Sequence, residues 1–399
     1  MGKPLVRSLP AVPTWARRPA LPAVLLAAAV AVSVAVGQPA PADRASGLSV
    51  PLSTTVEAPA DLGTLLLVST GRLTRHNLRT GTTEPVRLPA GQLAVRVWAM
   101  RGADVVLTRP APARPITDTP SPPEAVPPRP VPLTPGGLTQ HGPGGAGPQY
   151  GGGGLAPSPG WAYAVPHRGD PVRLGPATEV VPSLDGGGVW LSHGGVARLV
   201  NLDGSAVPAR VSVPFGYRLV GAARPGLVAT VGGVDPHTVV LPVDGAPPRW
   251  LADAEALDVV DGVLLVHDQH RVGWVSLSTG ARHWLPRLSA VEVTGPGTLA
   301  PGAESFAVRA RVNQHARLVV GQVDAGSVGQ LRVVALEGGD ASDHPTAPVW
   351  TRDGSVLAIR PDQRMVVYRP GDARASVLGA RYTASGVAAV GPAGHDLPH

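Results

Sequence analysis

Apolar and polar residues alternate with a period of two in short stretches along most of the chain. Between Pro348 and Gly371, two such stretches are separated by Pro361-Asp362, and Arg352-Asp353-Gly354 precedes the first of them. A two-residue period is typical of a β-strand, while Asp and Gly supply the side-chain hydrogen bond and the positive φ of a tight turn. This part of the sequence therefore predicts a tight turn followed by a β-hairpin.

The same order of strands and turns recurs along the chain with a period of about 40 to 45 residues. Gly or Pro falls every few residues, and the i, i+3, i+4 pattern of an amphipathic helix is missing. Four short strands at this period predict the blade of a β-propeller. Copies of this pattern begin near Thr64, Gly160, Val181, Gly226, Gly262, Leu299 and Pro348, and a disturbed second unit contains VRVWAMRGADVVL.

The predicted fold is all-β, a β-propeller of about seven four-stranded blades, with six or eight blades left open. We expect it to occupy residues 61–390, followed by a tail at 391–399. A blade that is apolar on both faces is not stable alone, so blades stack into a ring that usually borrows a closing strand from one terminus. Either LSVPLSTTV after Gly47 or YTASGVAAV after Arg381 could supply that strand.

The openings of several units share a proline and a turn. Pro182 precedes Asp185-Gly186 and Pro348 precedes Asp353-Gly354, whereas Pro301-Gly302 keeps a turn without the aspartate. These units resemble the WD40-like and TolB-like propeller repeats of exported bacterial proteins. The resemblance implies a fold, and it carries no active-site residues to this chain, because propellers host unrelated functions.

The N-terminal region has the pattern of an export signal or a membrane anchor. A basic leader at 1–18 precedes an uncharged apolar run at 19–38, which is long enough to cross ~30 Å of hydrocarbon at 1.5 Å per residue. The positive-inside rule places the leader in the cytoplasm and the rest of the chain outside. The run is either a retained transmembrane anchor or a cleaved signal peptide, and residues 39–60 are expected to form a linker.

The net charge of +6 and the pI near 10.4 do not by themselves indicate nucleic-acid binding. Residues up to Arg44 carry +4 of this charge and the remainder only +2. A nucleic-acid-binding surface needs clustered positive charge on the folded part, so we expect no nucleic-acid partner. The chain has no cysteine, which excludes disulfides and a thiol nucleophile.

One segment, residues 109–160, fits no blade. It is first rich in proline and then rich in glycine. Neither half can bury enough apolar surface to offset its ordering entropy, so we predict a disordered insertion that projects from blade two. Alternatively it is a docking arm, in which Pro130-Val131-Pro132 and its neighbours lie in an aromatic groove.

Three groups of residues are candidates for chemistry, and none predicts a catalytic, cofactor or metal site. Residues 183–190 match the Asp-box turn of sialidase-like propellers except at Val189. His267-Asp268-Gln269-His270 and His283 are possible metal ligands, but a site needs at least three that converge. The tryptophans fall on predicted strands, where packing between blades explains them.

Two classes of function follow. The first is a non-catalytic binding or scaffold module for an envelope protein or peptide, attached to the cell membrane by its N-terminal segment with the C-terminal domain outside, or secreted. The second is a propeller enzyme, a hydrolase or oxidoreductase, with its active site in the central channel. Three or more ionisable side chains with perturbed pKa values at the channel mouth would favour the enzyme.

Overall fold

The computed structural model describes residues 49–53, 62–112, 160–224, 226–268, 271–285, 291–313, 315–323, 331–336, 346–382, 384 and 386–390. The chain divides into two units, Met1–Gly47 and Leu48–His399, and every described residue belongs to the second. Within the described ranges every regular element is a β-strand, which confirms the all-β prediction.

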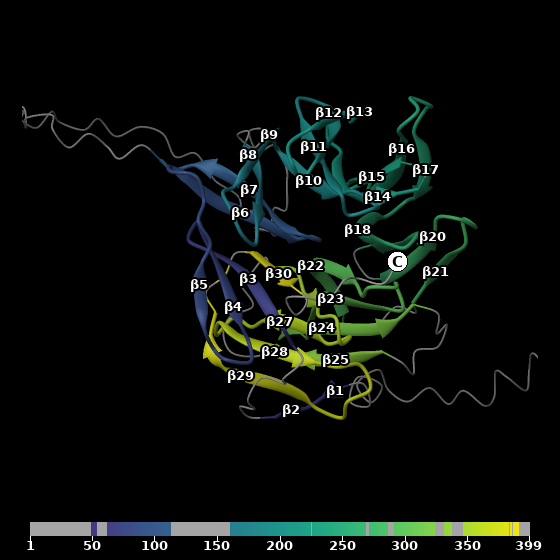
Figure 1. Cartoon of the computed structure of the whole chain (residues 1–399). Coiled ribbons are helices and arrows are strands. Elements are labelled where there is room, and N and C mark those ends of the chain that lie inside the picture. Colours follow the sequence, from purple (N-terminus) through teal and green to yellow (C-terminus); the bar gives the residue numbers. More distant parts are fainter. Residues whose placement is uncertain are drawn as a thin grey trace, which may run out of the picture. The chain divides into compact units, whose positions relative to one another are not determined.

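The strands form seven sheets that follow one another around a ring, so the fold is a seven-bladed β-propeller (Figure 1). Blade 1 contains β30 (Gly386–Val390), β3 (Thr64–Ser69), β4 (Arg72–Asn77) and β5 (Thr83–Pro85). Blade 2 contains β6 (Gln92–Ala99), β7 (Ala103–Pro110), β8 (Gly160–Pro166) and β9 (Val172–Ala177). Blade 3 contains β10 (Glu179–Pro182), β11 (Gly188–His193), β12 (Val196–Asn201) and β13 (Ala206–Ser212).

Blades 4 to 7 repeat this order. Blade 4 contains β14 (Arg218–Ala223), β15 (Gly226–Val231), β16 (His237–Pro242) and β17 (Arg249–Ala252). Blade 5 contains β18 (Glu255–Val260), β19 (Val263–Asp268), β20 (Arg271–Ser276) and β21 (Arg282–Trp284). Blade 6 contains β22 (Val291–Leu299), β23 (Ser305–Val312), β24 (His315–Gln322), β25 (Arg332–Ala335) and the added β1 (Ser49–Val50). Blade 7 contains β26 (Val349–Trp350), β27 (Val356–Ile359), β28 (Arg364–Tyr368), β29 (Ala375–Arg381) and the added β2 (Leu52–Ser53).

The first strand of each blade lies on the inside of the ring. Accordingly, β10 packs beside β14, and β14 packs beside β18. Each inner strand begins on the face where the second strand of its blade ends, because the two are antiparallel: Arg218 lies opposite Thr230, and Glu255 lies opposite His267. We call this the top face of the propeller.

The C-terminal segment closes the ring. Strand β30 pairs antiparallel with β3, with Gly386 opposite Val68 and Val390 opposite Thr64, so it becomes the inner strand of blade 1. Of the two segments that the sequence offered for this role, the one after Arg381 therefore supplies the closing strand.

The N-terminal segment has a different place. Residues 49–53, which the sequence placed in a linker from 39 to 60, form β1 and β2, which pair in parallel with the outer strands β25 and β29. The last strand of a blade leaves unpaired backbone groups at its outer edge, and these pair with the added segment. Val50 is 3 % exposed and belongs to the apolar core that blades 6 and 7 share. The segment therefore joins the outer edges of two neighbouring blades.

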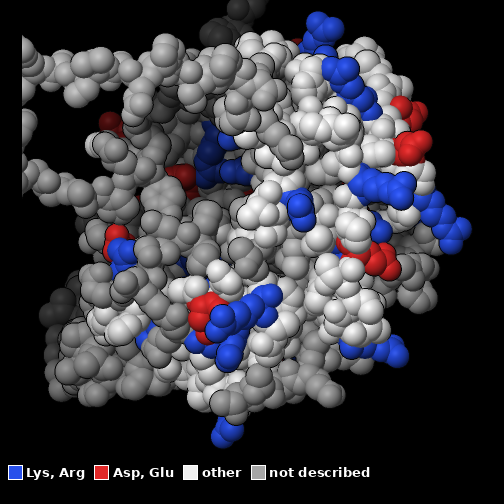
Figure 2. Space-filling model, turned by 90° about the vertical axis from the view of Figure 1, so that its left-hand side faces the viewer, with Lys and Arg blue, Asp and Glu red and all other residues white. Residues whose placement is uncertain are grey.

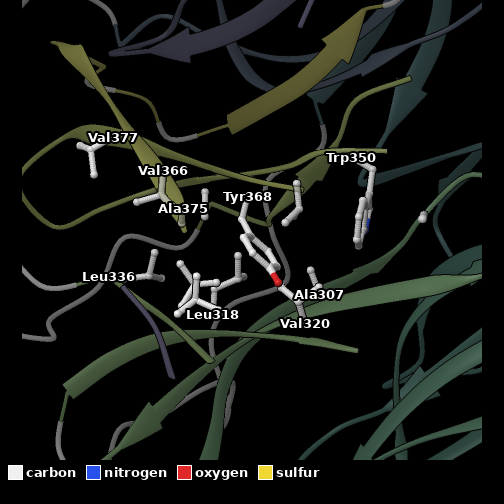
Figure 3. Packing of buried hydrophobic residues seen from close by; sticks show 14 residues of the cluster. Ala307, Leu318, Val320, Leu336, Trp350, Val366, Tyr368, Ala375 and Val377 are labelled. Atoms are coloured by element: carbon white, nitrogen blue, oxygen red, sulfur yellow. The ribbon is translucent and has the colours of Figure 1, made fainter. Parts of the chain in front are cut away.

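Apolar side chains between neighbouring blades form the core. Figure 3 shows the cluster between blades 6 and 7, where Tyr368 and Trp350 of blade 7 lie among side chains of blade 6 that include Leu318 and Val320. Burying a side chain of this size stabilises a fold by about 1.5–3 kcal/mol. Because these contacts lie between sheets, each blade depends on its neighbours for stability.

The inner strands approach each other closely. A Cβ added at Gly221 of β14 would lie 2.1 Å from Cγ1 of Val259 on β18, and one added at Gly297 of β22 would lie 2.8 Å from Cδ1 of Leu257. Neither separation is possible between real carbon atoms without a shift. Glycine at these positions therefore allows the inner strands to pack against each other.

The predicted insertion falls between β7 and β8. Arg109 and Pro110, which the sequence assigned to the insertion, belong to β7, and Gly160 begins β8. Residues 113–159 lie outside the described residues, as do the leader at 1–18, the apolar run at 19–38 and the tail at 391–399. Within the described part of the chain, no helix has the length and apolar character needed to cross a membrane.

Candidate functional site

Three neighbouring blades each place a charged residue at the first position of the inner strand. These residues are Glu179 on β10, Arg218 on β14 and Glu255 on β18. Because the inner strands begin on the top face, the three residues lie where the central channel opens on that face. Together with His267 at the end of β19, they form what we call the charged row.

Arg218 and His267 approach Glu255 from two sides. Arg218 Nη2 donates to Glu255 Oε1 at 2.8 Å and to the carbonyl oxygen of Ala256 at 2.9 Å. His267 Nε2 lies 3.6 Å from Glu255 Oε2. That distance is longer than the 2.8 Å contact between Arg218 and Glu255. Interactions with the side chains of His267 and Arg218 outweigh the effect of burial and lower the pKa of Glu255 to about 2.

The pKa of Glu179 is shifted in the opposite direction to that of Glu255. Burial raises the pKa of Glu179, although the backbone N–H of Leu219 donates to its Oε2 at 2.8 Å and the positive charges of Arg218 and Arg96 act in the other direction. The row therefore contains two carboxyl groups of different character: Glu255 is anionic over the whole physiological range, whereas Glu179 accepts a proton more readily than a glutamate in water.

The row remains accessible. The side chain of Arg218 is 44 % exposed and that of Glu255 is 25 % exposed. Both hydrogen bonds that hold Arg218 use Nη2, while an arginine carries five N–H donors in a fixed fork. The arrangement can therefore offer a rigidly held guanidinium, a carboxylate and a protonatable carboxyl to one ligand.

The residues that match an Asp box form a structural turn on the opposite face. Ser183 Oγ donates to Asp185 Oδ1 at 2.6 Å, and the N–H of Gly188 donates back to Ser183 Oγ at 3.0 Å. A turn built in the same way joins β26 to β27, where Thr351 Oγ1 donates to the carboxylate of Asp353. These side chains bond to their own turn, so they close the loop between the first two strands of a blade.

The suggested histidine cluster does not converge. His267 contacts Glu255, whereas His283 on β21 stacks on Trp274 with ring centroids 5.6 Å apart. Arg271 binds Asp268 through Nε and Nη2, and residues 269 and 270 lie outside the described ranges. Among the described residues, no group of three or more His, Cys, Asp or Glu side chains is placed to hold a metal ion.

The tryptophans in the described ranges all lie on strands, and one differs from the expected packing. Trp190, Trp274 and Trp350 are buried between blades, as predicted, whereas Trp250 on β17 is 51 % exposed. The guanidinium of Arg173 covers the ring of Trp161 at 3.3 Å from its centroid. Packing between blades thus explains most of these rings, but not Trp250.

No pattern in the sequence singled out Glu179, Arg218 or Glu255. Their common signal is a charged residue at the start of the inner strand on three successive blades. This signal becomes readable only when the strand boundaries are known, because each blade contains several other charged positions. His267 was singled out, but as a possible metal ligand rather than as a neighbour of Glu255.

Charges on the surface are mixed. Figure 2 shows one side of the molecule, on which basic and acidic side chains of the described residues lie interspersed. This distribution agrees with the small net charge of the chain after residue 44.

No protein-family model matches the chain, and no curated protein sequence matches it. Among solved structures, a functionally unknown protein from Desulfotomaculum acetoxidans DSM 771 aligns with a TM-score of 0.50 and 8 % identity over 83 % of this chain and 99 % of that one. A putative TolB from Agrobacterium tumefaciens aligns with a TM-score of 0.37 and 14 % identity over 54 % of this chain and 88 % of that one. Apo AztD from Citrobacter koseri aligns with a TM-score of 0.41 and 13 % identity over 82 % of this chain and 98 % of that one. At these identities the similarity is one of fold alone, and it assigns the chain to no family.

Proposed function

We propose that this protein is a non-catalytic binding module that recognises an envelope protein or peptide at the charged row. The observation that carries the proposal is the row itself, in which inner strands of three blades bring Glu179, Arg218 and Glu255 to one face. Arg218 binds Glu255, and Glu179 accepts a hydrogen bond from the backbone N–H of Leu219, so these side chains are ordered before a ligand arrives. Such preorganisation lowers the entropic cost of binding.

The charges of the row also suggest how a ligand is selected. Glu255 is anionic and lies beside the exposed guanidinium of Arg218. A ligand can therefore bind Arg218 through a carboxylate and Glu255 through a basic group, and both interactions are favourable. The C-terminus of a peptide beside a basic residue has this chemistry. A ligand of uniform charge would meet repulsion at one of the two positions, and that repulsion contributes to specificity.

The location is part of the same proposal and rests on the sequence. An apolar run at 19–38 behind a basic leader favours a protein that the N-terminal segment holds at the outer side of the cytoplasmic membrane. A cleaved signal peptide at the same place would release the propeller instead. Either outcome puts the charged row outside the cytoplasm.

The test is crosslinking in living cells with the full-length, tagged chain, followed by membrane fractionation and mass spectrometry of the captured proteins. We expect the wild type and the control Arg282→Ala to capture the same envelope protein. Arg282 is a suitable control because it is an exposed arginine on the outer strand β21 of blade 5. Arg218→Ala should reduce capture by about tenfold or more, which corresponds to about 1.4 kcal/mol.

Two results would contradict the proposal in different ways. Equal capture by Arg218→Ala and the wild type would exclude the charged row as the recognition site. A processed chain that leaves the membrane fraction without any reproducible partner would exclude the scaffold role as a whole. In both experiments the unfolding midpoint of each variant must match that of the wild type, so that a loss of capture reports on binding.

A hydrolase is the second candidate, and one observation favours it. Glu179 and Glu255 have pKa values shifted in opposite directions, which is the pattern of a general acid paired with an ionised carboxylate. Arg218 and His267 also contact Glu255 at this end of the inner strands. Assays on chromogenic glycosides, esters and peptides should then show a hydrolysis rate that both Glu179→Gln and Glu255→Gln abolish. A rate that neither variant changes would come from elsewhere and would exclude this site as an active centre.

A further inference from the structure

A group of exposed apolar and aromatic side chains lies on the top face of blades 3 and 4. Phe215 and Val234 are almost fully exposed, at 104 % and 92 %, and Trp250 is 51 % exposed. Tyr217 and His237 lie between them in the chain and contact each other. We call these five residues the aromatic patch. Large apolar side chains gathered on a surface mark an interaction site, because their exposure to water is unfavourable.

The rings of the patch are fixed in place. The hydroxyl of Tyr217 lies 2.6 Å from Nε2 of His237, and the ring of His237 stacks on that of Trp250 with centroids 4.7 Å apart and planes 11° from parallel. The indole N–H of Trp250 donates to Asp253 Oδ1 at 3.0 Å. One face of the indole is covered by His237 and its only polar atom is occupied, so the exposed part is an apolar platform that loses little rotamer freedom on binding.

The turn before β14 exposes Phe215. The N–H of Tyr217 donates to the carbonyl of Pro214 at 3.2 Å, and Gly216 has a φ of +86°. Phe215 therefore occupies the corner of a tight turn whose next position requires glycine. Its side chain is fully exposed, and it lies two positions before Tyr217 in the loop that leads from β13 of blade 3 to β14 of blade 4.

The proline-rich connection between β7 and β8 begins on the same face as the aromatic patch. The second and third strands of every blade are joined on the top face, so the connection from β7 to β8 leaves blade 2 on the face that carries the turn from β15 to β16. Residues 113–159 of this connection lie outside the described ranges. Residues 113–135 contain nine prolines, among them the run Pro127-Pro128-Arg129-Pro130-Val131-Pro132.

The length of this segment is sufficient to reach the patch. Sheets that pack face to face lie about 10 Å apart, so blades 2 and 4 are separated by roughly 20 Å near the axis. The residues at 113–126 can span about 43 Å at ~3.1 Å per residue in the polyproline conformation. The run that follows them can therefore lie on blade 4 without strain.

We propose that the proline-rich residues 113–135 bind to the aromatic patch of the same chain. Rows of aromatic rings bind polyproline segments, which lose little entropy because they are already extended. The charges are complementary, since the exposed carboxylates of Asp235 and Asp253 lie at the border of the patch and Arg129 stands inside the proline run. This inference is independent of the proposed function, because it uses neither the charged row nor an external ligand.

The experiment places the photo-reactive residue p-benzoylphenylalanine at position 131 of the full-length chain. After irradiation, mass spectrometry maps the crosslinked peptides. We expect crosslinks to peptides that contain 213–217, 232–237 or 249–253. The same residue placed at position 155, in the glycine-rich half of the connection, is the control and should give at least fivefold fewer crosslinks to these peptides.

Three variants connect the crosslinks to the chemistry of the patch. Trp250→Ala and Arg129→Glu should each reduce the crosslinks from position 131 by about fivefold or more. Leu184→Ala should leave them unchanged, because Leu184 is an exposed apolar residue on the opposite face. Unfolding midpoints confirm that each variant is folded, so that a lower yield reports on contact with the patch.

A mixture of isotope-labelled and unlabelled chains distinguishes binding within one chain from binding between two copies. Crosslinks that join peptides of the same isotope composition support the proposal. Crosslinks that join labelled to unlabelled peptides would replace it with a contact between two copies. Crosslinks at position 131 that are no more frequent than at position 155, or that Trp250→Ala does not reduce, would overturn it.

Discussion

The carboxylate of Glu179 on blade 3 accepts a hydrogen bond of 2.8 Å from the backbone N–H of Leu219 on blade 4. This contact joins the inner strands of two blades at the top face. The carboxyl group is removed from water where it makes this hydrogen bond, and this burial raises the pKa of Glu179. The bond and the charge of this residue therefore have opposite effects on stability, and two substitutions can separate them.

Glu179→Gln should leave the free energy of unfolding at neutral pH unchanged or higher, because the amide oxygen can still accept from Leu219 while the buried charge is removed. Glu179→Ala should lower it by about 1–3 kcal/mol, since the N–H of Leu219 loses its partner. A folded-state pKa above the ordinary 4.5 means that stability falls as the pH rises above that value. Urea unfolding from pH 4 to 8 should show this fall in the wild type and a smaller one in Glu179→Gln. If Glu179→Gln and Glu179→Ala lowered the free energy of unfolding by the same amount at neutral pH, the hydrogen bond from Leu219 would not be the stabilising contact of this residue.

Glu255 should show the opposite dependence on pH. Its pKa of about 2 lies below the ordinary 4.5, so its contribution is fully present above pH 4.5 and is lost as the pH falls toward 2. Because the side chain is partly exposed, we expect Glu255→Gln to cost about 1–2 kcal/mol at pH 7 rather than the full value implied by the shift. The difference should vanish near pH 2. The exposed Glu84 on β5 provides the control Glu84→Gln, which should change the free energy of unfolding at pH 7 by less than about 0.5 kcal/mol.

Gly221→Ala should destabilise the propeller through the contact with Val259. The added methyl group would overlap Cγ1 of Val259, and overpacking of this kind typically costs about 1–3 kcal/mol. Gly187→Ala is the matched control, because a Cβ at that position meets only the side chain of Asp185, at distances of 3.6 Å or more. Urea midpoints of the two variants give the comparison. If Gly221→Ala unfolds at the wild-type midpoint, the inner strands are not as close as the structure places them.

Removal of the closing strand should open the ring. A chain that ends at residue 385 lacks β30, so the edge of β3 and the apolar side chains of blade 1 become exposed. We expect this chain to unfold at lower urea concentration, with a broader transition, and to aggregate. A chain that ends at residue 390 keeps β30 and serves as the control, with wild-type unfolding. Sharp, unchanged unfolding of the shorter chain would show that β30 is dispensable for closure.

The N-terminal segment should stabilise the outer edges of blades 6 and 7. Val50 is buried in their common core, whereas the neighbouring Ser49 is exposed. Val50→Ala should therefore cost roughly 1–3 kcal/mol, and Ser49→Ala should cost less than about 0.5 kcal/mol. Thermal unfolding of the two variants measures the difference. Equal midpoints would mean that β1 contributes nothing to the packing of these blades.

The blades could be predicted because their signals are local. The hairpin expected after Arg352-Asp353-Gly354 is β27 and β28, and the expected turn Asp185-Gly186 lies between β10 and β11 of blade 3. Alternation depends on which face of its own strand a residue occupies, and a turn depends on a few neighbouring residues. Recurrence of these patterns at one period was enough to predict about seven blades.

Closure of the ring could not be predicted in the same way. The segments after Gly47 and after Arg381 both alternate, and both become strands, one at the outer edges of blades 6 and 7 and the other inside blade 1. Pairing between strands far apart in the chain depends on which backbone edge remains free when the ring has formed. That edge is a property of the assembled sheets rather than of either segment.

The sequence by itself determined the all-β fold and its repeating unit, because the period of a strand and the residues of a turn act over short distances. Only the tertiary structure decided the candidate site. Arg218 meets Glu255 across 37 positions of the chain, and Leu219 meets Glu179 across 40. Neighbouring blades bring these residues together because their inner strands pack side by side around the axis. No local sequence pattern predicts which of the many charged residues will face each other there.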